Sequence, residues 1–300
     1  MNALLAFDTA TEQMSIALAV ADSVWVHQHP QVRAAPSPPP EGVKKSGTAT
    51  FSCEHPQVRA APSPSPAGVK KSGKATFSSE AAGGALASAT LVPAILSLLG
   101  QAGVTLRELD AIAFGRGPGA FTGLRTACSV AQGLAFGANK PVLPIDTLLT
   151  VAEDARAGQP MWQGWVTMDA RMDEIYAGHY RFAAGHWQVL GEPRLTTPQA
   201  LNDAWRAAPP DGVAGNALEV FGDRLQPGAA QRFPMAMPRA AAMLPLARQL
   251  WAQGGAVPAA QALPLYLRDK VAQTTAEREA ARRSVASQPN QPNHALGAAS

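Results

Sequence analysis

The chain has 300 residues, 46% of them hydrophobic, and a net charge of +3, which is enough apolar material for one large or two ordinary domains. Its two cysteines, Cys53 and Cys128, show neither metal-ligand spacing nor a disulfide framework, which favours a reducing compartment. The first 20 residues lack a basic leader and are interrupted by Asp8 and Glu12, which argues against a signal peptide or a membrane span. We expect a soluble cytoplasmic protein that makes no membrane contact.

Three strands are predicted at the start of the chain. Residues 4–7 form a continuous apolar run, residues 14–20 alternate large apolar side chains with small ones, and residues 23–27 form a third short segment. Short apolar runs bounded by polar turns are typical of strands.

A near-identical tandem repeat follows these strands. Residues 29–54 recur as residues 55–80, with 22 of 26 positions matching. The two copies carry seven basic and three acidic residues, so the positive charge of the chain is located in them. They are rich in proline, serine and alanine and lack apolar periodicity, which predicts a disordered insertion over residues 29–79.

The remainder shows the same order of elements twice. In the first half, helix patterns over residues 88–103 and 122–137 alternate with strands over residues 109–114 and 141–145. The second half again predicts three strands, a helix, a short strand and a late helix, over residues 164–169, 174–182, 186–192, 197–207, 212–217 and 240–255. This repetition predicts an α/β protein with the duplicated ribonuclease-H-like fold of actin, Hsp70 and sugar kinases, built from two βββαβα halves.

We expect the first actin-like half over residues 1–145, the second over residues 146–275, and a disordered tail over residues 276–300. In this fold each half begins with a strand that ends in a polar turn at the cleft. Here those turns begin at Asp8 and Asp169, so a carboxylate ends the first strand of each half. Both carboxylates are expected to organise their turns by accepting hydrogen bonds from nearby backbone amides.

Four segments resemble the bacterial TsaB family, also described as glycoprotease-like or M22-peptidase-like: LLAFDTATEQMSIAL, AFGRGPGAFTGLRTACSVAQGLA, MDARMDEIYAGHY and PLYLRDKVA. The resemblance covers residues 1–28 and 80–273, and GRGPGAFTGLR is its most specific part. It implies a role in forming N6-threonylcarbamoyladenosine at position 37 of tRNAs that read codons beginning with A. It also implies pairing with the catalytic paralogue TsaD, joined by the ATPase TsaE, with tRNA reached through the complex. A homodimer is the alternative for the isolated chain.

The resemblance implies no catalytic role for this subunit. The catalytic paralogue binds its metal with a histidine pair on the first-half helix, but residues 83–100 contain no histidine. His27, His29 and His55 lie at or within the repeat, where their proximity in sequence is expected to be accidental. We therefore expect no catalytic residue, no metal ligand and no required cofactor.

The glycine-rich bend at residues 114–126 has two interpretations. A helix N-terminus with free amides beside Arg116 and Arg125 is a suitable anion site, but the spacing is not that of a phosphate loop and no lysine follows. Close packing of the bend on its neighbours, with Thr122 capping the helix, explains more. ATP or ADP binding remains the alternative, and its candidate nucleotide or anion site comprises Asp8, Thr9, Arg116, Gly117, Gly119, Thr122, Gly123 and Asp169.

A partner is expected on the two first-half helices. The first is apolar nearly all round, and the second carries alanines every four residues that allow close approach. The predicted interface consists of Leu91, Ile95, Leu98, Ala127, Ala131, Leu134 and Ala135, with an internal core helix pair as the alternative.

Two functional hypotheses follow. In the first, the chain is a non-catalytic subunit that scaffolds TsaD and TsaE. In the second, it is a stand-alone metal- or nucleotide-dependent hydrolase, a glycoprotease-like peptidase that uses the cleft around Asp8 and Asp169. The missing histidine pair favours the first.

Overall fold

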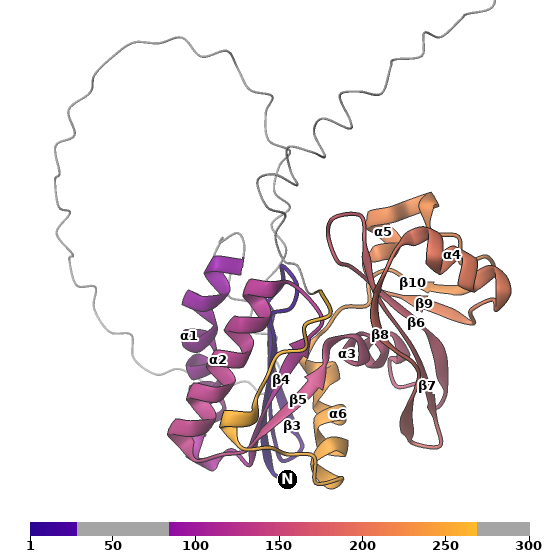
Figure 1. The fold of residues 1–300 in the computed structure, drawn as a ribbon. Coiled ribbons are helices and arrows are strands. Elements are labelled where there is room, and N and C mark those ends of the chain that lie inside the picture. Colours follow the sequence, from indigo (N-terminus) through magenta and orange to yellow (C-terminus); the bar gives the residue numbers. More distant parts are fainter. Residues whose placement is uncertain (29–83, 269–300) are drawn as a thin grey trace, which may run out of the picture.

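The structure is a computed structural model that describes residues 1–28 and 84–268 (Figure 1). The insertion predicted over residues 29–79 and the tail predicted over residues 276–300 lie outside the described residues. Two five-stranded sheets form the two halves, and helices cover both of them.

The first sheet has the strand order β3-β2-β1-β4-β5. Its strands are β1 (Ala3–Asp8), β2 (Ser15–Val20), β3 (Ser23–Gln28), β4 (Ala111–Gly117) and β5 (Val142–Asp146). Strand β2 runs antiparallel to its neighbours β1 and β3, whereas β4 runs parallel to its neighbours β1 and β5.

The second sheet repeats this topology, with the strand order β10-β9-β6-β7-β8. Its strands are β6 (Trp162–Asp169), β7 (Ile175–Ala183), β8 (His186–Thr196), β9 (Gly212–Ala214) and β10 (Gln231–Phe233). Each half therefore has the order βββαβαβα, and the predicted duplicated ribonuclease-H-like fold of the actin type is confirmed.

Helices pack on both faces of each sheet. The helices are α1 (Gly84–Ala102), α2 (Phe121–Ala138), α3 (Thr147–Arg156), α4 (Pro198–Ala207), α5 (Ala217–Phe221) and α6 (Ala240–Ala252). In the first half, α1 and α2 cover one face and α6 covers the other, although α6 follows the second sheet in the chain. In the second half, α3 lies on one face, and α4 and α5 lie on the other. None of the helices within the described ranges is long and apolar enough to cross a membrane.

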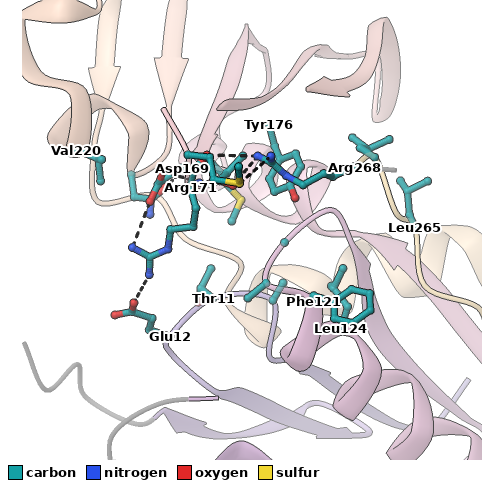
Figure 2. Close-up of a pocket in the computed structure, with 18 of the residues that line it drawn as sticks. Thr11, Glu12, Phe121, Leu124, Asp169, Arg171, Tyr176, Val220, Leu265 and Arg268 are labelled. Carbon is teal, nitrogen blue, oxygen red and sulfur yellow. Dashed lines mark hydrogen bonds and ion pairs between the residues drawn. The ribbon is translucent and has the colours of Figure 1, made fainter. Parts of the chain in front are cut away.

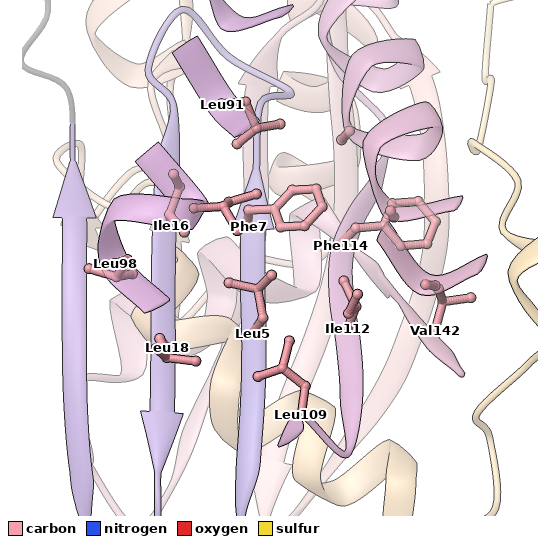
Figure 3. Packing of buried hydrophobic residues seen from close by; sticks show 14 of the residues in the cluster. Leu5, Phe7, Ile16, Leu18, Leu91, Leu98, Leu109, Ile112, Phe114 and Val142 are labelled. Carbon is pink, nitrogen blue, oxygen red and sulfur yellow. The ribbon is translucent and has the colours of Figure 1, made fainter. Parts of the chain in front are cut away.

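Side-chain alternation along β1 explains the double cover of the first sheet. Leu5 and Phe7 pack under α1 and α2 (Figure 3), whereas Leu4 and Ala6 pack under α6. Because both faces are buried, the strand needs apolar residues at every position, which is why the sequence pattern is a continuous run.

Several elements differ from the sequence predictions. Helices α3 and α5 and the short strand β10 were not predicted. Helix α2 begins at Phe121 after Ala120, without a side-chain cap, so the predicted capping role of Thr122 is wrong. Helix α1 begins at Gly84 rather than at residue 88, and it ends, as predicted, just before Gly103, whose φ of +70° suits glycine.

Candidate functional site

The turn after β1 encloses Asp8 completely. One carboxylate oxygen accepts a hydrogen bond from the Ala10 amide (2.6 Å) and the other from the Thr147 hydroxyl (3.0 Å), and the side chain is 0% exposed. Burial raises the pKa of the Asp8 carboxyl to about 6, although both hydrogen bonds act in the opposite direction. Gly115 lies directly against the carboxylate, and a Cβ at that position would overlap it.

The glycine-rich bend packs tightly on the same turn. Thr9 donates its hydroxyl hydrogen to the Gly123 carbonyl oxygen (2.8 Å), and the Ala120 amide donates to the Ala10 carbonyl oxygen (2.7 Å). A Cβ on Gly123 would overlap the Thr9 carbonyl oxygen, and one on Gly119 would lie 2.6 Å from the Ala10 Cβ. The glycines therefore serve the close approach of two backbone segments.

The other residues of the predicted nucleotide or anion site are also engaged within the protein. Arg116 forms an ion pair with Asp146. The Gly117 amide donates to the Thr147 hydroxyl (3.2 Å), and Thr122 lies in the first turn of α2. Asp8 and Thr9 are buried and the glycines are packed against the same turn, whereas Thr122 and part of the Arg116 side chain are exposed. Within residues 1–28 and 84–268, no three His, Cys, Asp or Glu side chains gather as metal ligands.

The equivalent turn of the second half is open and strained. Arg171, Met172 and Asp173 have φ values of +61°, +55° and +64°, a run of left-handed conformations that costs a non-glycine residue about 1–2 kcal/mol each. The Asp169 carboxylate accepts from the Arg171 amide (2.9 Å), and Arg224 binds the Asp173 carboxylate with two hydrogen bonds of 2.6 Å. These contacts hold the turn in its unfavourable backbone conformation.

Two arginines connect this turn to the rest of the molecule. Arg171 reaches across to Glu12 of the first half and forms an ion pair with it (Figure 2). Arg268, near the end of the described chain, pairs with Glu174 (2.5 Å) and donates to the Ala170 carbonyl oxygen (3.1 Å). The turn is therefore held from the first half and from the C-terminal segment.

A cavity of about 380 Å³ lies between the two halves beside this turn (Figure 2). It is lined by Met237 and by residues 10–12, 119–121, 124, 168–172, 176, 216, 219–220 and 265–268. Of the eight residues predicted for the nucleotide or anion site, only Gly119 and Asp169 line it. The structure therefore separates the predicted residues: Asp8 and Thr9 are buried, whereas Gly119 and Asp169 line the cavity.

The predicted partner interface is mostly buried within the chain. Six of its seven residues pack between the helices and the first sheet, and the seventh, Leu134, is partly buried against them. The helix pair instead exposes Leu96 and Phe136, at 51% and 85%, and Gly133 and Gly137, where an added Cβ would meet no atom within 4 Å. We call Leu96, Gly133, Phe136 and Gly137 the outer face of α1 and α2.

Sequence reasoning missed three residues of the site. Thr147 was not predicted because α3 was not, and Arg268 entered only as part of the segment PLYLRDKVA. Tyr176 follows the strained turn as the second residue of β7, on the same face of the strand as Tyr180. The period-two alternation of β7 places both tyrosines on one face of the strand, but no local pattern places Tyr176 at the cavity.

Comparisons with known proteins agree with this geometry. A family model described as TsaD, tRNA N6-adenosine threonylcarbamoyltransferase, matches residues 85–277. The chain is 33% identical over 197 residues to the Escherichia coli K12 protein named tRNA threonylcarbamoyladenosine biosynthesis protein TsaB, covering 61% of this chain and 80% of the relative. It is also 33% identical over 195 residues to the Haemophilus influenzae protein of the same name, covering 60% and 79%.

A solved structure described as YeaZ from Pseudomonas aeruginosa is similar over 89% of this chain and all of its own, with 32% sequence identity and a TM-score of 0.64. A second solved structure, described as an uncharacterized Pseudomonas aeruginosa protein with similarity to peptidase YEAZ, also has 32% identity and a TM-score of 0.65. Sequence, family model and fold agree, and the chain belongs to the TsaB family, within the larger group that the TsaD model describes.

Proposed function

We propose that the chain is the non-catalytic partner subunit for N6-threonylcarbamoyladenosine formation at position 37 of tRNAs that read codons beginning with A. In this proposal it docks the catalytic paralogue TsaD, works with the ATPase TsaE, and reaches tRNA through the complex in the cytoplasm. The names of the relatives support the pathway. The enclosed Asp8 and the histidine-free helix α1 support the non-catalytic role.

The outer face of α1 and α2 is the observation that carries the docking proposal. Phe136 is 85% exposed, although burying a phenylalanine side chain stabilises a protein by about 1.5–3 kcal/mol. Gly133 and Gly137 lie on either side of Phe136 in the sequence and have no side chains. Another helix can therefore approach the backbone of α2 closely. An exposed aromatic residue between glycines is better suited to a protein interface than to solvent.

The test is co-expression of the full chain with TsaD and TsaE from the same organism, followed by gel filtration. Phe136→Asp and Gly133→Arg are expected to abolish the complex, because both place a charge in the contact without altering the core. Val189→Asp is the matched control, since Val189 is also exposed, at 47%, but lies on β8.

Mass spectrometry of digested tRNA supplies the functional readout in cells whose own subunit has been removed. Loss of the modified nucleoside with Phe136→Asp, but not with Val189→Asp, supports the proposal. A complex that survives both outer-face variants would place the partner elsewhere. Failure of the unmodified chain to bind TsaD would end the partner-subunit assignment.

A further inference from the structure

The cavity between the halves has two facing walls. Met168 and Tyr176 line it from the second half, and Phe121 and Leu124 line it from the first. Tyr176 lies opposite Phe121 and Leu124 (Figure 2). A volume of about 380 Å³ falls within the range of sites that enclose small organic molecules. The partner-docking face lies on other side chains, so the cavity is independent of the function proposed above.

Tyr176 presents a polar group to this cavity. Its ring packs between α3 and the second sheet, and the residue is 8% exposed. Its hydroxyl oxygen is not among the fully buried, unpaired polar atoms of the described residues, so it is accessible from the cavity that the residue lines. In Figure 2 the hydroxyl oxygen points from the upper wall towards the space above Phe121 and Leu124. This accessible hydroxyl group can donate a hydrogen bond to a ligand in the cavity or accept one from it.

The charges that line the cavity do not favour an anion. Glu12, Asp169 and Glu219 contribute three carboxylates, against the two guanidinium groups of Arg171 and Arg268. Arg171 is paired with Glu12 and Asp169, and Arg268 with Glu174. Both cations are therefore engaged within the protein, and Glu219 forms no ion pair with any described residue. A phosphate group entering this cavity would meet an excess of negative charge.

The walls favour an aromatic ligand. The Phe121 and Tyr266 rings contact each other with centroids 5.2 Å apart, and Tyr266 is 43% exposed. Met168, Met172 and Met237 also line the cavity, and thioethers contact the edges of aromatic rings favourably. A flat aromatic ligand between these walls would exchange contacts with water for contacts with the protein on both faces of its ring.

We propose that the cavity between the two halves binds an uncharged heteroaromatic molecule that forms a hydrogen bond with the Tyr176 hydroxyl group. The ring lies between the methionine and aromatic walls, and the charged side chains remain at the rim. Adenosine, indole and AMP are suitable probes. Adenosine and indole are neutral heteroaromatics, and AMP adds a phosphate to the adenosine framework.

The experiment is a saturation-transfer NMR titration of the full chain with each probe. Adenosine and indole are expected to give saturable signals, with AMP at least about tenfold weaker than adenosine because its charge is not compensated. Tyr176→Phe should weaken adenosine binding about fivefold by removing one hydrogen bond. Val220→Trp, which places an indole ring at the exposed rim, should abolish the binding of both neutral probes.

Tyr180→Phe is the matched control. Tyr180 lies on the same strand and has a fully buried hydroxyl group without a partner among the described residues, but it does not line the cavity. Both Tyr→Phe variants remove a single oxygen, so both should fold, and only Tyr176→Phe should alter adenosine binding. The proposal is overturned if neither neutral probe saturates, if AMP binds more tightly than adenosine, or if both variants weaken binding equally.

Discussion

Asp8 and Asp169 end the first strand of the first and second halves, respectively, yet their surroundings differ. Asp8 is 0% exposed and sealed by a glycine-rich bend, whereas Asp169 lines a cavity beside three left-handed residues. Duplication has kept the strand order of the two sheets but not the role of the turn. One turn has become part of the core, and the other remains a surface that can contact a ligand.

The largest expected effect concerns the packing of the glycine-rich bend on the turn after β1 in the first half. Gly123→Ala should lower the free energy of unfolding by about 3 kcal/mol, because its Cβ would overlap the Thr9 carbonyl oxygen and two backbone segments would have to separate. Gly133→Ala, in the same helix but in open space, should instead raise it by about 1 kcal/mol through helix propensity. Urea unfolding of both variants measures the difference, and equal effects would show that the bend is not tightly packed.

The pH dependence of stability tests the enclosed carboxylate. The pKa of Asp8 rises from its ordinary 3.8 to about 6 on folding, so the folded state binds the proton more tightly and stability falls as the pH rises from about 4 to 6. At 1.36 kcal/mol per unit the loss is about 3 kcal/mol. Asp8→Asn should remove this loss, whereas Asp169→Asn retains Asp8 and should retain the slope. A slope that persists in Asp8→Asn would assign the effect to another buried acid, of which Asp154 is the first candidate because burial also raises its pKa.

The smallest expected effect concerns the strained turn of the second half. Met172→Gly should raise the free energy of unfolding by about 0.5 kcal/mol, since glycine adopts a φ of +55° without steric cost. Ala184→Gly relieves a similar φ of +52° in the hairpin between β7 and β8, away from the cavity, and should give a comparable gain. Thermal unfolding compares the two. A loss of stability confined to Met172→Gly would mean that the methionine side chain, which contacts Arg268, holds the turn in place.

Alternation and helix periodicity predicted most strands and four of the helices, because those segments are long and bounded by polar turns. Helix α3 was not predicted because it begins at Thr147, directly after the last residue of β5. No turn residue separates the strand from the helix and marks the boundary. The interface prediction took Leu91, Ile95 and Leu98 as outward-facing, although their spacing places them on a single stripe, and the structure turns that stripe to the sheet. The cavity combines five segments distant in sequence, so local patterns carry no information about it.

The segment Leu265–Arg268 spans both halves. The Leu265 amide donates to the Arg116 carbonyl oxygen (2.6 Å), the Tyr266 ring contacts Phe121, and Arg268 holds the strained turn. The chain also passes between the halves at α3 and again before α6, so three connections limit how far they can separate. These connections hold the walls of the cavity together, which lowers the entropic cost of ordering them around a ligand.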